Sequence, residues 1–372
     1  MIIYRCVLVL LLLTVATIAD ETQESADSEW RVFRGNSALT GVAAGTFTNQ
    51  PELKWTAALE GSIQTGIVAD SERAYFATEE GMVTALSLVD GAVLWAFKTE
   101  NDIKSTPAID EISLYFGDEG GMLYRLNKVD GSLLWSFEAE GEIVSSVNFY
   151  EDQVLFGSYD QFVYCLEKKN GAIAWKIETD GYVNATPAIA GDRAIVAGCD
   201  GFLRVINLTE GVEEKTIEIG AYVGASPAIV GDIAYVGTYD NRVVAIDFVK
   251  GSILWSYEHP KRKFPFYASA AVADNKVFAA GRDKMLHAIA ISNGEELWTH
   301  SMRARIDASP LVIENRVVIA AKSGEIVILG LADGETLWEY DTGASVGATP
   351  ALINGQLLVA TADGSIFCFG GQ

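Results

Sequence analysis

The stretch "ASPAIVGDIAYVGTYDNRVVAIDFVKGSILWSYE", residues 225–258, contains four short apolar segments separated by turn residues. The segments cover residues 225–230, 233–238, 242–247 and 252–258, and their apolar runs and alternation are typical of β-strands. Each junction contains glycine, aspartate or asparagine, and these residues favour tight turns. The stretch therefore predicts one unit of four antiparallel strands.

The same unit recurs along the chain. Its most regular part is a glycine followed four residues later by a tryptophan, and these glycines are 40 residues apart except for one interval of 43. A period near 40 made of short strands is typical of β-propeller blades. The tryptophan is expected to pack between adjacent blades. The predicted blade-docking residues are Trp95, Trp135, Trp175, Trp255, Trp298 and Trp338, with Lys215 in the one copy that lacks a tryptophan, and Trp55 just before the first unit.

A serine or threonine opens the first strand of every unit, and Pro-Ala usually follows it. Proline lacks a backbone N–H and is tolerated only at a sheet edge. The first strand is therefore expected to be innermost, where small side chains let the blades converge on the axis. Eight such positions predict eight blades: Thr65, Thr106, Ser146, Thr186, Ser226, Ser269, Ser309 and Thr349.

The eighth unit stops after its third strand. Residues 51–59 carry Trp55 and directly precede the first unit, so they are expected to complete the last blade beside the C-terminal strand. This pairing removes the exposed sheet edge of an open ring. The sequence thus predicts an all-β, eight-bladed propeller of four-stranded antiparallel blades over residues 51–372, after a signal peptide (1–19) and a lead-in and cap (20–50).

Residues 1–19 combine an early cation, Arg5, with an apolar run and the small residues Thr17 and Ala19. The run is shorter than the roughly 20 apolar residues of a membrane span. This pattern predicts a cleaved secretory signal and a periplasmic or secreted protein without a membrane span, the alternative being an uncleaved anchor. Of the four cysteines, Cys165, Cys199 and Cys368 lie beyond this segment; their wide spacing predicts buried free thiols.

The formal net charge of −23 excludes general binding to nucleic acid, which needs a basic face. The histidines His259, His287 and His300 stand in no metal-ligand spacing, although His259 and His300 follow successive outer strands and could share a metal or pH-sensing site. Aspartates in the turns between second and third strands are interpreted as hairpin residues rather than ion ligands. They are Asp160, Asp200, Asp240 and Asp363.

The copies "AIDFVKGSILW" (245–255), "ALSLVDGAVLW" (85–95) and "AIAISNGEELW" (288–298) resemble the tryptophan-docking repeat of PQQ-like β-propellers, and the chain is most similar to the BamB-like exported subfamily. The opening "WRVFRGNSALTG" (30–41) is similar to a lead-in that precedes such propellers, so Trp30 and Phe33 are expected to pack on the end of the ring. The resemblance implies a noncatalytic scaffold in outer-membrane protein assembly with a protein partner from the cell envelope. The lipid-anchor cysteine of that subfamily is missing at the predicted signal-peptide cleavage site.

The resemblance also covers quinone dehydrogenases, which hold their cofactor between a tryptophan and a disulfide of adjacent cysteines beside calcium. This sequence has no Cys-Cys pair, and only Trp30 lies outside the docking set. We therefore expect no enzyme activity, no cofactor and no metal, and assign no catalytic residue. A propeller that binds a small ligand or a carbohydrate stays open as an alternative.

The stretch "HPKRKFPFY", residues 259–267, accounts for the interval of 43 residues. It lies in a loop between blades, on the face where acidic residues gather in early blades (Glu100, Asp102, Glu138, Glu140 and Glu142) and basic residues in later ones. We call the basic residues of the later blades, together with the neighbouring aromatic residues, the basic sector. We expect the protein to be a monomer and the basic sector to dock an acidic or extended peptide segment of a partner. The alternative is that the segment is only a solvated loop. The candidate residues of the basic sector are Lys261, Arg262, Lys263, Phe264, Phe266, Tyr267, Arg282, Lys284, Arg303, Arg305 and Lys322.

Overall fold

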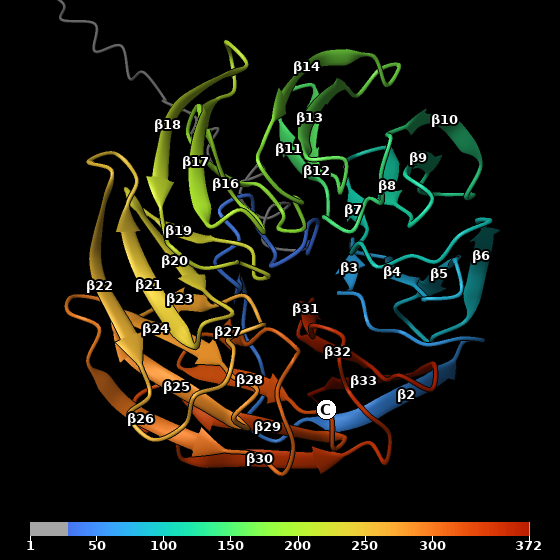
Figure 1. Cartoon of the computed structure of the whole chain (residues 1–372). Coiled ribbons are helices and arrows are strands. Elements are labelled where there is room, and N and C mark those ends of the chain that lie inside the picture. The colour runs from blue at the N-terminus through green and yellow to red at the C-terminus, as the bar shows by residue number, and fades with distance from the viewer. Residues whose placement is uncertain (1–28, 372) are drawn as a thin grey trace, which may run out of the picture.

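The computed structural model describes residues 29–371, whose strands form eight sheets around a central axis (Figure 1). Each sheet contains four antiparallel strands of one blade, and the sequence-based prediction of an eight-bladed propeller is confirmed. Blades 1 to 7 each use four consecutive strands, from β3–β6 to β27–β30. Blade 8 combines β31–β33 with β2 from the other end of the chain.

The four strands of a blade run from the axis to the rim. The innermost strands are β3 (Val68–Ala69), β7 (Ala108–Ile109), β11 (Asn148–Tyr150), β15 (Ala188–Ala190), β19 (Ala228–Val230), β23 (Ala271–Ala273), β27 (Leu311–Ile313) and β31 (Ala351–Ile353). The second strands are β4 (Arg73–Ala77), β8 (Ser113–Gly117), β12 (Gln153–Gly157), β16 (Arg193–Ala197), β20 (Ile233–Gly237), β24 (Lys276–Ala280), β28 (Arg316–Ala320) and β32 (Gln356–Ala360).

The third strands are β5 (Met82–Ser87), β9 (Met122–Asn127), β13 (Phe162–Glu167), β17 (Phe202–Asn207), β21 (Arg242–Asp247), β25 (Met285–Ala290), β29 (Glu325–Gly330) and β33 (Ser365–Gly370). The outer strands are β6 (Val93–Lys98), β10 (Leu133–Glu138), β14 (Ile173–Glu178), β18 (Val212–Glu218), β22 (Ser252–Glu258), β26 (Glu296–Ser301), β30 (Thr336–Asp341) and β2 (Glu52–Ala58).

In blade 5, strands β20, β21 and β22 begin where the sequence predicts them. The inner strand β19 begins at Ala228, three residues later than expected. Pro227 has no N–H to give, and the N–H of Ser226 donates to Ser269 Oγ of the next blade at 2.9 Å. The chain therefore enters the blade through a bond to its neighbour rather than through its own sheet.

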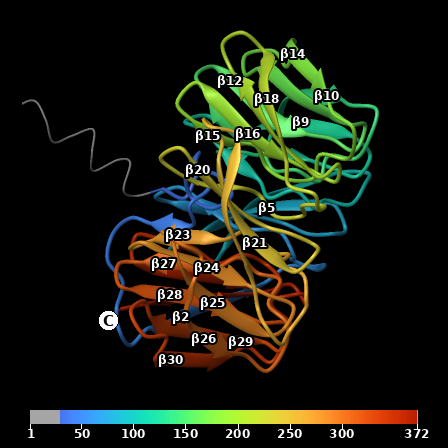
Figure 2. The ribbon, with the colours of Figure 1, turned by 60° about the vertical axis from the view of Figure 1, so that its left-hand side comes forward.

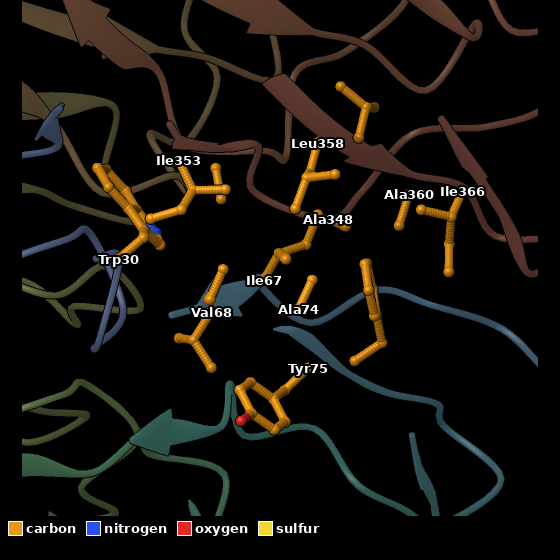
Figure 3. Close-up of a cluster of buried hydrophobic side chains, with 14 of the residues drawn as sticks. Trp30, Ile67, Val68, Ala74, Tyr75, Ala348, Ile353, Leu358, Ala360 and Ile366 are labelled. Carbon is orange, nitrogen blue, oxygen red and sulfur yellow. The ribbon is translucent and has the colours of Figure 1, made fainter. Parts of the chain in front are cut away.

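The ring is closed by β2, which pairs antiparallel with β33 and places Trp55 opposite Cys368. The N–H of Leu59 extends this pairing to the carbonyl of Gly364 at 2.9 Å. Beside this sheet, Ile353 and Leu358 of blade 8 share a buried cluster with Val68 and other side chains of blade 1 (Figure 3). The two ends of the chain are thus joined by a sheet and by a core.

The lead-in does more than cover one end of the ring, because it winds inside it. Trp30 exchanges two backbone hydrogen bonds with Ala69 of blade 1, and the segment ends in β1 (Val42–Ala43), which pairs parallel with β27 of blade 7. Between these points its carbonyls accept N–H groups from the inner strands of other blades, which satisfies their free edges. The acceptors Arg31, Ser37, Ala38, Thr40 and Gly41 serve Ile109, Ile189, Ile229, Val272 and Val312, respectively.

Arg34 anchors the lead-in. Its side chain is fully buried, and its guanidinium donates to the carbonyls of Pro310 (2.6 Å) and Ala270 (3.0 Å). Burial lowers the pKa of Arg34 to about 9. The two bonds tie the lead-in to blades 6 and 7.

Adjacent blades meet where a tryptophan of one lies on a glycine of the next. The indole Nε1 of Trp95 donates to the carbonyl of Lys128 at 3.1 Å, and its ring lies against Gly131. In the copy without tryptophan, Lys215 Nζ donates to the carbonyl of Val249 in the same turn, one residue beyond the position that the tryptophans use. The same indole bond is made by Trp55 to Leu88, Trp135 to Lys168, Trp175 to Leu208 and Trp255 to Ile291, while Trp298 packs on Gly334 and Trp338 on Phe369.

Two glycines of similar backbone conformation allow the stabilisation from blade packing to be measured apart from the cost of backbone strain. Gly131 has φ of 72° and a Cβ added there would lie 2.6 Å from the Trp95 ring, whereas Gly191 has φ of 62° and open space around it. We expect Gly191→Ala to lose about 1 kcal/mol of unfolding free energy through strain alone. Gly131→Ala should lose about 2 kcal/mol more, because the methyl group separates two blades. Urea unfolding measures both, and equal losses would contradict the docking role.

Candidate functional site

One face of the propeller is built from two sets of loops, and Figure 2 shows the ring obliquely, turned from the view of Figure 1. One set joins the outer strand of a blade to the inner strand of the next, and the other joins second to third strands. In each blade the two are linked by a backbone bond, as from Tyr159 N–H to the Glu142 carbonyl at 2.9 Å. We call this the loop face. The other donor and acceptor pairs are Glu79 and Ser62, Glu119 and Asp102, Cys199 and Tyr182, Tyr239 and Tyr222, Arg282 and Pro265, Lys322 and Arg305, and Ala362 and Ser345.

The eight serines and threonines around the axis form a hydroxyl belt. Ser226 Oγ accepts the N–H of Thr186 at 2.9 Å, and seven such bonds link blade 1 in sequence to blade 8. At the seam, Thr65 Oγ1 instead donates to the carbonyl of Ala77 in its own blade at 3.1 Å. Sequence reasoning explained these residues by their small size and missed the bonds. The available signal was that all eight carry a hydroxyl.

Inside the hydroxyl belt lies a cavity of about 550 Å³, which we call the axial cavity. Phe33 of the lead-in contributes to its lining, and residues of the loop face surround it. Polar side chains thus converge on the axis from many blades. Besides the belt, they include Gln64, Glu79, Lys104, Tyr159, Asn184, Tyr267, Arg282, Asp307 and Lys322.

Tyrosines gather on the loop face over blades 3 to 6. Tyr159 stacks on Tyr182 with ring centroids 4.8 Å apart, and Tyr239 meets Tyr267 edge-on at 5.9 Å. Burial raises the pKa of Tyr159 and of Tyr239 to about 12. Of these tyrosines, only Tyr267 was expected from the sequence. The available signal was that tyrosine recurs at one position of the turns between second and third strands and at one position of the loops between blades. Tyr222, 63% exposed, completes the group.

A family comparison agrees with this geometry. The model for the family of the outer membrane protein assembly factor BamB matches residues 46–158, 141–264 and 216–370, which together span the propeller. The chain belongs to the BamB family. No curated protein sequence matches it.

Solved structures show the same fold at low identity. BamB from Moraxella catarrhalis is 18% identical, with a TM-score of 0.74 over 87% of this chain and 98% of its own. The computationally designed Ika8 protein is 15% identical, with 0.77 over 86% and 100%. The quinohemoprotein alcohol dehydrogenase from Comamonas testosteroni is 11% identical, with 0.80 over 92% and 80%. At these identities the likeness concerns the fold alone.

The longest exposed run of the basic sector in this BamB-family chain lies at residues 261–264. Lys261 and Phe264 face solvent, and the Phe264 side chain is 50% exposed. Arg262 is held in place by a bond from its guanidinium to the carbonyl of Asp283 at 2.8 Å, and Lys263 pairs with Glu258 at 3.2 Å. This segment presents an aromatic ring among cations.

The remaining cations of the sector are largely balanced. Arg282 and Arg305 both pair with Asp307, at 2.9 and 3.1 Å, and Arg303 pairs with Asp341 at 2.8 Å. Arg282 also lies over the ring of Tyr267, 4.3 Å from its centroid. Two lysines differ in exposure: Lys284 is exposed, whereas Lys322 donates to Gln64 and has a pKa lowered by burial. The sector is therefore less positive than its sequence indicates.

The expectation that Phe266 belongs to the docking surface is wrong. Its side chain is only 3% exposed and lies against Gly237 of blade 5 and the ring of His287. Phe264, two residues earlier, is 50% exposed. Phe266 therefore fixes the loop to the blade, whereas Phe264 presents its ring to solvent.

The histidines are arranged differently from the sequence-based hypothesis. His259 makes its ring contact with His287, 5.5 Å away, rather than with His300. His287 is fully buried, as a packed histidine in a third strand is expected to be. The described residues contain no cluster of three or more side chains that could hold a metal.

His287 is held between two carboxylates by a continuous set of hydrogen bonds. Its Nε2 lies 3.1 Å from Asp283 Oδ2, and its Nδ1 lies 2.9 Å from the hydroxyl of Tyr257. The same hydroxyl donates to Glu296. The imidazole is thus linked to Asp283 on one side and, through Tyr257, to Glu296 on the other.

We expect His287→Phe to lose about 3 kcal/mol of unfolding free energy, because Asp283 and Tyr257 are left buried without their partner. His300→Gln is the matched control, since His300 is half-buried in the neighbouring strand, and it should change stability by less than about 0.5 kcal/mol. Urea unfolding at neutral pH measures both. A loss at His287 no larger than that at His300 would show that these hydrogen bonds carry no net stabilisation.

The turn aspartates have the geometry of hairpin turns. The residues that follow them, Gln161, Gly201, Asn241 and Gly364, all have positive φ. Asp160 and Asp200 each accept the N–H two residues ahead at 3.0 and 3.1 Å.

Within residues 29–371, no helix is long and apolar enough to cross a membrane. The signal peptide expected at residues 1–19 lies outside this range.

Proposed function

We propose that this protein is a noncatalytic, monomeric scaffold of the bacterial envelope that holds a protein partner during outer-membrane protein assembly. The family match supports the process, and the loop face supports the mode of action. The observation that carries the proposal is the segregation of charge on that face. Acidic residues dominate the loops of blades 1 to 5, whereas cations gather in blades 6 and 7 around Phe264.

Such a face suits recognition of an extended segment. Lys261 and Lys284 make no ion pair within the described part of the chain, so an acidic partner residue can pair with them. Phe264 can bury its exposed ring, and aromatic and arginine side chains dominate binding energy at protein interfaces. The acidic loops of blades 1 to 5 would repel the acidic residues of the same partner, which disfavours binding in the reversed orientation.

Quinone dehydrogenase activity is not part of the proposal, although a quinohemoprotein shares the fold. The ring's tryptophans lie between blades, where they bond to backbone carbonyls and pack on glycines. Cys165, Cys199 and Cys368 are separate free thiols. A stacking tryptophan and a pair of adjacent cysteines, which the quinone enzymes use, therefore have no counterpart in the described ring.

A photo-crosslinking amino acid at position 261 tests the scaffold directly. In the native envelope we expect an adduct with a component of the outer-membrane protein assembly machinery, and Arg262→Glu with Lys284→Glu in the same protein should reduce it about tenfold. Lys169 is the matched control, because it is exposed in a turn opposite the loop face. An adduct at position 169 of equal yield, or no adduct with that machinery at position 261, would contradict the proposal.

Export predicts a particular thiol count. If residues 1–19 are removed, Cys6 is lost, and the unfolded protein from the envelope should titrate three thiols rather than four. In the folded protein only Cys199 should react, because Cys165 and Cys368 are buried and burial raises the pKa of each to about 12. A fourth thiol in the unfolded protein would show that the segment is retained as an anchor.

A further inference from the structure

The axial cavity is a built polar site that the scaffold proposal does not use. Its volume of about 550 Å³ lies within the range of about 300 to 1,000 Å³ typical of small-molecule sites. Phe33 of the lead-in lines the axial cavity, and the other lining side chains come from blades all around the ring. A ligand there would contact many blades at once.

The hydroxyl belt leaves hydrogen-bond donors at the border of this space. In Ser146, Ser226 and Ser309 the hydroxyl oxygen accepts an N–H from the preceding blade. The hydroxyl hydrogen of each makes no bond to another described residue and is available to a ligand. An acceptor is also available, because Asn184 Oδ1 is buried and unpartnered within residues 29–371. Unsatisfied buried groups of this kind favour a ligand that both donates and accepts.

Most charges of the lining already have partners. Arg282 pairs with Asp307 at 2.9 Å and Lys104 pairs with Glu119, whereas Lys322 donates to the neutral amide of Gln64 and shares the lining with the acidic Glu79. Binding an anion or a cation would require breaking or sharing these pairs. A neutral polar ligand meets no such cost.

Two flat rings stand among these polar groups. Tyr159 and Tyr267 both line the axial cavity, and Tyr159 is backed by its stacked neighbour Tyr182. Rings of this kind combine an apolar face with a polar edge. A sugar ring offers the matching combination, with C–H groups on its faces and hydroxyls around its edge.

We infer that the axial cavity binds a neutral carbohydrate, with one or two sugar rings against Tyr159 and Tyr267 and their hydroxyls bonded to Asn184 and the hydroxyl belt. This site is separate from the docking surface at residues 261–264, so either can fail without the other. Its occupant is defined by its chemistry, whether it is a free oligosaccharide or the end of a longer glycan.

Saturation-transfer NMR with N,N′-diacetylchitobiose, cellobiose and maltose tests the inference on the purified exported protein. We expect at least one disaccharide to bind with a Kd of about 1 mM or tighter. Asn184→Phe, which fills the axial cavity, and Tyr159→Ala, which removes a ring, should each weaken binding at least about tenfold. Tyr222→Ala is the matched control, because Tyr222 is exposed outside the axial cavity, and should leave binding unchanged.

Unchanged melting temperatures would show that the variants fold, and Tyr159→Ala serves if Asn184→Phe does not. Succinate is titrated as an anionic probe. Binding of succinate but of none of the disaccharides would overturn the inference in favour of an anion site. It would also be overturned if no disaccharide binds, or if binding persists in both cavity variants. A free glycan is distinguished from a longer chain by whether affinity rises from disaccharide to hexasaccharide.

Discussion

The hydrogen bonds between β2 and β33 hold the two ends of the chain in one sheet, and the arrangement of the whole ring depends on them. Each blade buries its faces only against its two neighbours, so an open seam would expose the apolar faces of blades 8 and 1 together. The pairing places Trp55 on Gly91 of blade 1, which makes this seam equivalent to the other docking contacts. The lead-in then spans the closed ring from blade 1 to blade 7.

The functional surfaces follow from this closure. With the blades fixed, the hydroxyl belt connects their inner ends in sequence, and loops from adjacent blades are bonded to each other by backbone groups. Side chains far apart in the sequence, such as Tyr159 and Tyr267, therefore border one cavity. Because these bonds hold the loops in place, the loops lose little conformational entropy when a partner binds, which favours recognition of a flexible partner.

The sequence was sufficient for the fold because the repeat places each turn and docking residue at a constant spacing. The interval of 43 residues located the loop at 259–267, and Trp55 identified the closing strand. The sequence could not distinguish Phe264 from Phe266, since that depends on which way an irregular loop turns each side chain. It also could not pair His259 with His287, because ring contacts between blades depend on side-chain rotamers.

The central claim, that β2 closes one cooperative ring, is tested most directly by two proline substitutions in that strand. Leu59 N–H bonds to Gly364, so by alternation the N–H of Ala57 also faces β33 while that of Thr56 faces solvent. Urea unfolding should show a single transition, coincident by fluorescence and circular dichroism, that shifts as a whole to lower urea in Ala57→Pro and far less in Thr56→Pro. A transition in Ala57→Pro that splits into steps, or that does not move, would contradict the claim.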